Sequence, residues 1–229
     1  MESRTFGRIK ITPPGLTEPG LYLSRVESLE SERGIVQEFQ YADATLRELD
    51  LAGTQLITGR ITGLRAARVR FEAVNLHGVQ LDACDLGSAQ WTGSKLTRVA
   101  FRNCRIMGAA LDDLVLDHVL FDRCKLDYTA FTKVRVAGPV AFSGCGLTEA
   151  SLTDCDLSDA VMRDCTLRET EFGRGRYQGL DLRDNDLTAL RGVASLNRVL
   201  IDRAQQDQLA QALVAELGIS YGDDDLNTP

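Results

Sequence analysis

The chain has 229 residues, of which 44% are hydrophobic and 26% charged, and its formal net charge is −7. This composition is that of an ordinary folded protein with enough residues to bury a substantial core. The acidic excess lies beyond residue 137, and so acidic a surface excludes nucleic acid as the expected direct ligand.

Residues 1–40 are predicted to form an N-terminal cap segment. They lack the periodic pattern that follows them, and Pro13, Pro14 and Pro19 interrupt regular structure. Their first ten residues are charged and contain no apolar stretch, so no signal peptide is predicted. No apolar run in the chain approaches the ~20 residues that cross a bilayer. We therefore expect a cytoplasmic protein without membrane contact.

Large apolar residues recur at every fifth position between Leu46 and Leu187, with one extra residue near Gly138 and Pro139. Only Ala66 departs from the pattern. An α-helix needs a spacing of 3.6 residues and a flat strand a spacing of 2, so neither explains this period. The series begins with Leu46, Leu51, Leu56, Ile61, Ala66, Phe71, Leu76, Leu81, Leu86, Trp91, Leu96 and Phe101.

A small or β-branched residue stands two positions before most of these large residues. Positions two apart on an extended segment point to the same side, so each unit sends one large and one small side chain inward. Leu64 and Ala66 exchange the two sizes within one unit, as a closely packed interior requires. The last two residues of each unit are rich in turn formers such as Gly53 and Gly78. Four units would complete a square coil of about 20 residues.

Several units resemble the A(D/N)Lxx unit of the pentapeptide-repeat family. They are VNLHG (74–78), CDLGS (84–88), CDLSD (155–159) and NDLTA (185–189). The resemblance implies an all-β solenoid over residues 41–190, a right-handed quadrilateral β-helix of about 7.5 coils, followed by a short C-terminal α-helix.

No enzyme site is predicted. Five of the cysteines repeat at one-coil spacing in the small inward position, and Cys155 takes that position on the opposite face, so buried, reduced thiols are expected. His77 and His118 fall at turns about two coils apart, too far to share a metal or a proton. We expect no catalytic residue, no metal and no cofactor.

Residues 191–219 are predicted to cap the C-terminal end of the solenoid and to join two subunits. Asp202 followed by Gln205 is typical of a helix start. Leu209, Ala212, Leu213 and Leu217 then form one apolar stripe, which either makes a homodimer interface or folds back as a lid. Residues 220–229 are expected to be a disordered acidic tail.

Two outward-facing features are candidates for partner binding. In the acidic C-terminal coils, like charges stack on one another, which is mildly unfavourable and leaves two interpretations, a solvated face or a surface aimed at a basic partner. An outward apolar row, Ala100, Leu120, Ala141 and Val161, is the second candidate. The candidate carboxylates are Glu149, Asp154, Asp156, Asp159, Asp164, Glu169, Asp181 and Asp184.

The family resemblance extends to members that confer antibiotic resistance by imitating DNA and binding DNA gyrase or topoisomerase IV. The resemblance implies a protein partner of that kind and a homodimer joined through the C-terminal helix. The present chain departs from that branch because its middle coils are slightly basic and no long loop interrupts its repeats. The alternative is a generic interaction scaffold with an unknown partner unrelated to topoisomerases.

Overall fold

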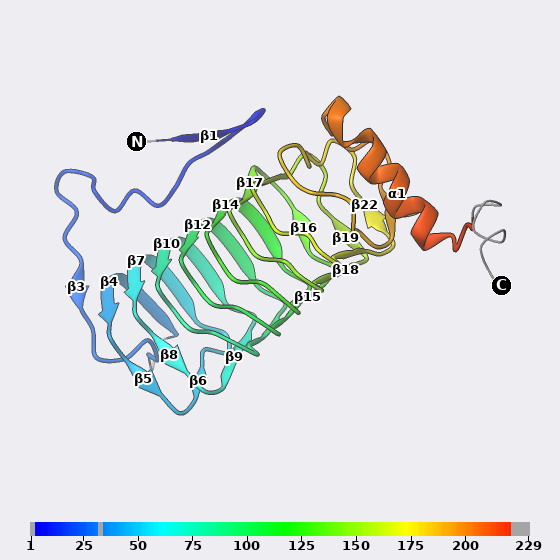
Figure 1. The fold of residues 1–229 in the computed structure, drawn as a ribbon. Coiled ribbons are helices and arrows are strands. Elements are labelled where there is room, and N and C mark those ends of the chain that lie inside the picture. The colour runs from blue at the N-terminus through cyan, green and yellow to red at the C-terminus, as the bar shows by residue number, and fades with distance from the viewer. Residues whose placement is uncertain (1–2, 32–33, 221–229) are drawn as a thin grey trace.

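The chain winds into a β-solenoid of about seven turns, closed at its C-terminal end by a short helix (Figure 1). The computed structural model describes residues 3–31 and 34–220. The predicted right-handed quadrilateral β-helix is confirmed. Of the tail expected at residues 220–229, all but Ser220 lies outside the described residues.

The strands of successive coils stack in parallel and cover the faces of the coil. Two adjacent faces share one sheet, made of β3 (Ser24–Arg25), β4 (Ile35–Ala42), β7 (Gln55–Thr62), β10 (Asn75–Asp82), β12 (Lys95–Arg102), β14 (Val115–Asp122), β16 (Arg135–Val136), β19 (Cys155–Asp156) and β22 (Gly175–Arg176), with β17 (Val140–Ser143) and β20 (Val161–Arg163) as a branch. Another face consists of β6 (Leu49–Asp50), β9 (Val69–Glu72), β11 (Gln90–Thr92), β13 (Ala110–Asp112), β15 (Ala130–Thr132), β18 (Ser151–Thr153) and β21 (Glu171–Phe172). The remaining face has β5 (Thr45–Leu46) and β8 (Arg65–Ala66), continued by isolated bridges.

The register confirms the five-residue period and its interruption. Leu76 pairs with Leu96 one coil on, whereas Val119 pairs with Val140, one residue further than the usual spacing. The extra residue is accommodated around Gly138. A side chain there would collide with its neighbour, because a Cβ atom would lie 2.0 Å from Asp117 Oδ1.

The large inward residues of successive coils form continuous stacks in the core. The rings of Phe101, Phe121 and Phe142 lie nearly parallel, with neighbouring centroids 4.8 Å apart. Leu64 is buried while Ala66 is only partly buried, as the exchange of volumes predicts. The inward phase assigned from the sequence is therefore the observed one.

Small inward positions also satisfy the backbone. Cys145 donates its thiol hydrogen to the carbonyl of Phe121 at 3.4 Å, and Thr129 donates its hydroxyl hydrogen to Ile106 at 2.9 Å. All six cysteines are buried and free, as predicted. Burial raises the pKa of the Cys155 thiol to about 11. These residues are packing groups with a useful weak donor.

The front of the solenoid differs from the predicted boundary at residue 41. Strand β4 begins at Ile35 and pairs with β7 in the ordinary register, so the first coil starts inside the segment expected to be a cap. Phe39 occupies a small inward position, and its ring fits because Gly59 above it has no side chain. Leu29 is buried in the same core, so the residues after β3 help to close this end.

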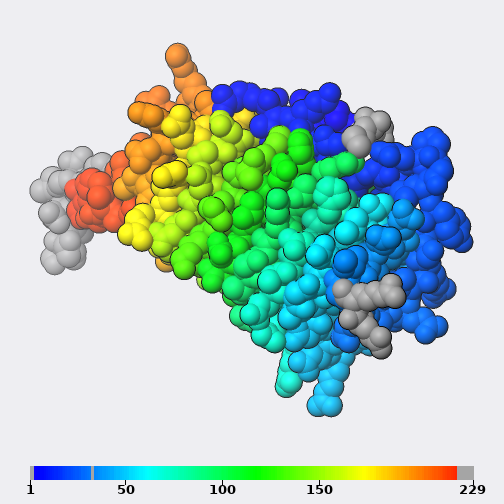
Figure 2. Space-filling view, turned by 180° about the vertical axis from the view of Figure 1, so that it is seen from behind, coloured from blue at the N-terminus to red at the C-terminus, as the bar shows by residue number. Residues whose placement is uncertain are grey.

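The first described residues do not cap the front at all. Strands β1 (Arg4–Phe6) and β2 (Ile9–Ile11) form an antiparallel hairpin whose two-residue loop has Gly7 at a φ of 51°. The hairpin lies along the outside of the coils, where β2 contacts β14 and β17. Figure 2 shows this dark-blue segment extending beside the green and yellow coils.

The C-terminal end is closed by η1 (Val193–Ser195), η2 (Arg203–Gln205) and α1 (Gln206–Glu216). The predicted start at Asp202 is confirmed, since its backbone N–H donates to Gln205 Oε1. Gln205 in turn donates to the carbonyls of Leu182 and Asn185 at 3.0 and 2.7 Å. In the described part of the chain, no helix has the length and apolar character that a membrane span requires.

Candidate protein-binding surfaces

Most of the candidate carboxylates stand at equivalent corners of their coils. The backbone there has a left-handed φ, which turns the chain between units. Glu149 and Glu169 occupy such corners in successive coils, and so do Asp164 and Asp184. The corner residues of the set are Glu149, Asp154, Asp159, Asp164, Glu169 and Asp184.

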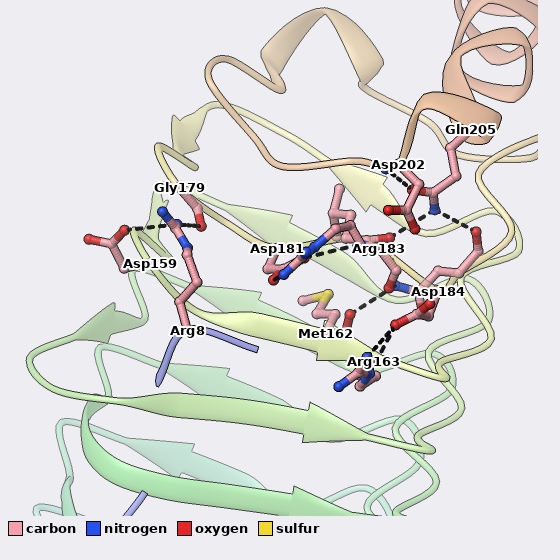
Figure 3. A network of polar contacts seen from close by, with 12 residues as sticks. Arg8, Asp159, Met162, Arg163, Gly179, Asp181, Arg183, Asp184, Asp202 and Gln205 are labelled. Atoms are coloured by element: carbon pink, nitrogen blue, oxygen red, sulfur yellow. Dashed lines mark hydrogen bonds and ion pairs between the residues drawn. The ribbon is translucent and has the colours of Figure 1, made fainter. Parts of the chain in front are cut away.

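Arginines neutralise most of these carboxylates. Arg163 Nη2 lies 2.8 Å from Asp184 Oδ2 (Figure 3), and Arg191 pairs with Glu169. The other pairs are Arg8 with Asp159 at 3.6 Å, Arg174 with Asp154 at 2.7 Å, Arg176 with Asp156 at 3.5 Å and Arg183 with Asp181 at 2.6 Å. The net charge of these coils is unchanged by the pairing, but most of the eight candidate carboxylates have a guanidinium beside them, and among the described residues only Glu149 and Asp164 do not.

The pairing changes the chemistry of individual carboxylates. The Arg174 guanidinium, hydrogen-bonded to Asp154, holds the pKa of that carboxyl below its usual range. Asp154 stacks directly on Arg174, and Asp156 stacks on Arg176, each one coil apart. Both ion pairs can therefore be predicted from the spacing of the repeats. These two columns pair opposite charges, in contrast to the like-charge columns of Glu149 with Glu169 and of Asp164 with Asp184.

Asp181 belongs to a buried network instead of the outer surface. Only 3% of the residue is exposed, and its carboxylate accepts two hydrogen bonds from the Arg183 guanidinium. The hydrogen bond from Arg183 lowers the pKa of Asp181. Gly7 of the hairpin loop lies directly against this carboxylate, and Arg8 donates to the Gly179 carbonyl at 3.2 Å (Figure 3). Asp181 is thus removed from the candidate surface, because the hairpin loop covers it.

The outward apolar row is a contact surface, and the chain's own hairpin covers it. Ala100, Leu120, Ala141 and Val161 are buried together with Phe6 and Ile11, and Ile9 packs beside them. The sequence signal for this partner was weak, consisting of alternating apolar residues around Gly7. The row is consequently closed to other partners while the hairpin is in place.

Two polar contacts hold the base of the hairpin. Arg4 Nη1 lies 3.1 Å from Asp122 Oδ2, and the Thr12 backbone N–H donates to His118 Nδ1 at 3.1 Å. His118 is therefore a structural acceptor, which the sequence did not indicate. His77 is exposed. Within residues 3–31 and 34–220, no group of His, Cys, Asp and Glu side chains is placed to hold a metal ion.

The C-terminal stripe is divided by the structure. Ala212 is buried, and Leu209 and Leu213 are partly buried against the core at the end of the solenoid. Leu217 is 60% exposed and Ile219 51% exposed. Leu209, Ala212 and Leu213 therefore cover the end of the solenoid as a lid, which was the alternative to a dimer interface. Dimerisation stays a prediction, and the structure leaves Leu217 and Ile219 as its apolar surface.

A model of the family described as pentapeptide repeats matches eight copies within residues 75–113 and 141–174. No curated protein matches the chain. Similar solved structures include trypsin-treated QnrB1, a plasmid-mediated fluoroquinolone resistance protein, with 14% identity over 80% of this chain and 99% of that chain and a TM-score of 0.45.

Full-length QnrB1 is 17% identical over 78% of this chain and 89% of that chain, with a TM-score of 0.37. HetL is a pentapeptide repeat protein involved in heterocyst differentiation regulation from the cyanobacterium Nostoc sp. strain PCC 7120. It is 14% identical over 72% of this chain and 86% of that chain, with a TM-score of 0.32. The family model matches residues 75–113 and 141–174, and the five-residue period and the stacked four-faced coils continue beyond those matches, so the chain carries the pentapeptide repeats that this family is named for.

Proposed function

We propose that this protein is a non-enzymatic binding protein whose acidic C-terminal coils engage the DNA-binding surface of a type II topoisomerase such as DNA gyrase. The observation that supports this proposal is the regular placement of corner carboxylates, with Glu149 above Glu169 and Asp164 above Asp184. Stacked coils are about 4.8 Å apart, and the phosphates of one DNA strand follow at about 3.4 Å along the axis. A basic groove built for phosphates would thus meet a comparable ladder of charges.

The arginine pairs do not prevent such binding. Surface ion pairs contribute about 0–1 kcal/mol each, so a dense basic groove can take over the carboxylates of Asp184 and Glu169. The solenoid also holds the corner residues rigidly, and little conformational entropy is lost when a partner binds. Binding of this kind should weaken steeply with salt, because exposed charges are screened within ~10 Å at 0.1 M.

The test is gyrase binding and supercoiling by a double variant, Glu149→Lys with Asp164→Lys. These two carboxylates have no ion pair among the described residues, and Lys133 and Arg123 already occupy left-handed corners of the same kind. We expect the variant to fold normally and to lose gyrase binding. Asp43→Lys, a corner residue of the front coil, is the matched control and should bind as wild type. Undiminished binding by the double variant would exclude the DNA-mimic surface.

A second candidate is a generic interaction scaffold unrelated to topoisomerases. It is favoured by the ion pairs on Asp154, Asp156 and Asp159, which reduce the electrostatic field of the acidic coils. The two candidates are separated by wild-type protein alone. If it binds neither DNA gyrase nor topoisomerase IV at low salt, the scaffold is the function that remains.

A further inference from the structure

A cavity of about 560 Å³ lies between the chain that follows the hairpin and the outer surface of the coils. Residues 13–19 form one wall. The opposite wall comes from three adjacent strands, with Arg60 and Thr62 on β7, Gln80 and Asp82 on β10, and Arg102 on β12. Since stacked strands are about 4.8 Å apart, the polar wall extends about 10 Å from β7 to β12. A monosaccharide-sized molecule spans that length.

Several hydrogen-bond donors on this wall have no acceptor among the described residues. Gln80 is only 9% exposed, yet its side-chain amide forms no hydrogen bond with any residue that the structure describes. Neither Arg60 nor Arg102 has a carboxylate within ion-pair distance in the described ranges, and the Nε atom of each is buried without a partner. The terminal guanidinium nitrogens of both arginines and the Gln80 amide, which no described residue occupies, would donate to an acceptor bound in the cavity.

The acidic residues of the cavity restrict what that acceptor can be. Asp82 accepts a hydrogen bond from Asn103, and the Glu18 carboxylate lies beside Gly15 together with the Arg98 guanidinium. Both carboxylates line the cavity and would repel an anion that brings no hydrogen-bond donors. An anion that also carries hydroxyl groups meets both requirements, because its oxyanion faces guanidinium groups and its hydroxyls donate to carboxylates.

The wall formed by residues 13–19 supplies shape more than polarity. Pro13, Pro14 and Pro19 have no backbone N–H group, and Leu16 adds apolar surface. The opposite wall is a hydrogen-bonded ladder in which Arg60 pairs with Gln80 in register and Asp82 pairs with Arg102. The donors are therefore held in place before any ligand arrives, which favours selective binding.

We propose that this cavity binds a small hydroxylated oxyanion, a sugar phosphate or a hydroxycarboxylate, through Arg60, Gln80 and Arg102. The site is separate from the acidic corners of the C-terminal coils, and it requires no topoisomerase. A ligand there would contact both the coils and residues 13–19, and would hold the N-terminal segment against the solenoid.

Isothermal titration calorimetry of the full chain with glucose 6-phosphate and with citrate tests the proposal. Saturable binding of either compound, with a Kd of about 1 mM or tighter, is the expected result, and the compound that binds identifies phosphate or carboxylate as the preferred oxyanion. Glucose, which has the hydroxyls without the charge, should not bind. Failure of both anions, or equal binding of glucose, would overturn the proposal.

Matched variants locate the site. Arg60→Gln and Gln80→Leu change outward side chains and leave the core untouched, so both should keep the wild-type melting temperature while weakening binding about tenfold or more. Arg68→Gln, an exposed arginine outside the cavity, is the control and should bind as wild type. Wild-type affinity in both Arg60→Gln and Gln80→Leu, with the fold intact, would show that any observed binding occurs elsewhere.

Discussion

Single residues stabilise this protein by meeting their equivalents in the next coil. Phe101, Phe121 and Phe142 stack face to face in the core, and inward polar groups serve the backbone of the neighbouring coil. Asn185 shows how strict this second role is, since its amide donates to the carbonyls of Met162 and Leu182 and its Oδ1 accepts the Cys165 N–H. Each inward position therefore has both a volume and a hydrogen-bonding requirement.

The aromatic stack should carry a large share of the stability. Replacing Phe121 with alanine removes a ring that contacts rings on both sides, and should lower the free energy of unfolding by about 3–5 kcal/mol. Lys125→Ala, an exposed position in the next unit, should change it by less than about 0.5 kcal/mol. Urea titrations measure both, and equal losses would contradict the inward assignment of Phe121.

The thiols should be nearly inert in the native protein. Burial raises the pKa of Cys155 from 9.0 to about 11, so its reactive thiolate is scarce at neutral pH. The stability linked to this group is fully present below pH 9, where the thiol stays protonated in the folded and unfolded chain. That stability is lost as the pH rises through about 11. Mass spectrometry after thiol labelling at pH 8 should show slow modification of all six cysteines, and rapid labelling of one would contradict this assignment.

At the scale of whole elements, the hairpin β1–β2 is a part of the fold that does not repeat from coil to coil. The hairpin β1–β2 has its only described strand pairing within itself, and it is held to the coils by side chains. Phe6 and Ile11 supply the apolar contact, and Arg4 and Arg8 supply the polar ones. The hairpin is thus a surface attachment whose removal leaves the stacked coils complete.

A charged residue at Ile11 should release the hairpin without unfolding the solenoid. Ile11→Asp places a carboxylate in the buried apolar row, an unfavourable environment for a charge. Chymotrypsin should then cleave faster within residues 12–23, at Leu16, Leu21 or Tyr22, while far-ultraviolet circular dichroism is unchanged. Lys10→Asp alters the exposed neighbour on the same strand and should be cleaved at the wild-type rate. Equal cleavage of the two variants would show that the row does not anchor the hairpin.

The sequence predicted the coils well because their contacts recur at a constant spacing. The phase of Leu76, Phe101 and Phe121 follows from the period, as does the extra residue near Gly138. Ion pairs in direct stacks, such as Asp154 with Arg174, follow the same spacing. Nothing periodic connects Arg4 to Asp122, which are 118 residues apart. The position of the hairpin, and the cavity beneath the chain that follows it, therefore depend on tertiary packing that a one-dimensional pattern does not contain.

The whole molecule is a rod with two different ends. At the front, β3 and Leu29 close the first coil, and at the back α1 lies across the last one. The back retains exposed apolar surface at Leu217 and Ile219. A second copy of the chain, joined about a twofold axis, would bury this surface and bring the two sets of acidic coils together.

Light scattering of two leucine variants tests the dimer. The wild type should be a dimer at micromolar concentration. Leu217→Glu should give a monomer with an unchanged melting temperature, because Leu217 is mostly exposed within one chain. Leu213→Glu should lower the melting temperature, because Leu213 packs against the core. A monomeric wild type would leave α1 as a lid and nothing more.

The hairpin also contacts two coils that lie a fixed distance apart along the rod. Stacked coils are interchangeable in their backbone geometry, so nothing in the ladder records how many of them there are. The base of the hairpin contacts Asp122 and its tip contacts Asp159 and Gly179. The hairpin therefore makes both contacts only when a fixed number of coils lies between them. Loss of a whole coil between these contacts would keep every strand paired, yet Arg4 and Arg8 could no longer reach their partners together. The hairpin contacts thus fit the number of coils that this chain has between Asp122 and Asp159.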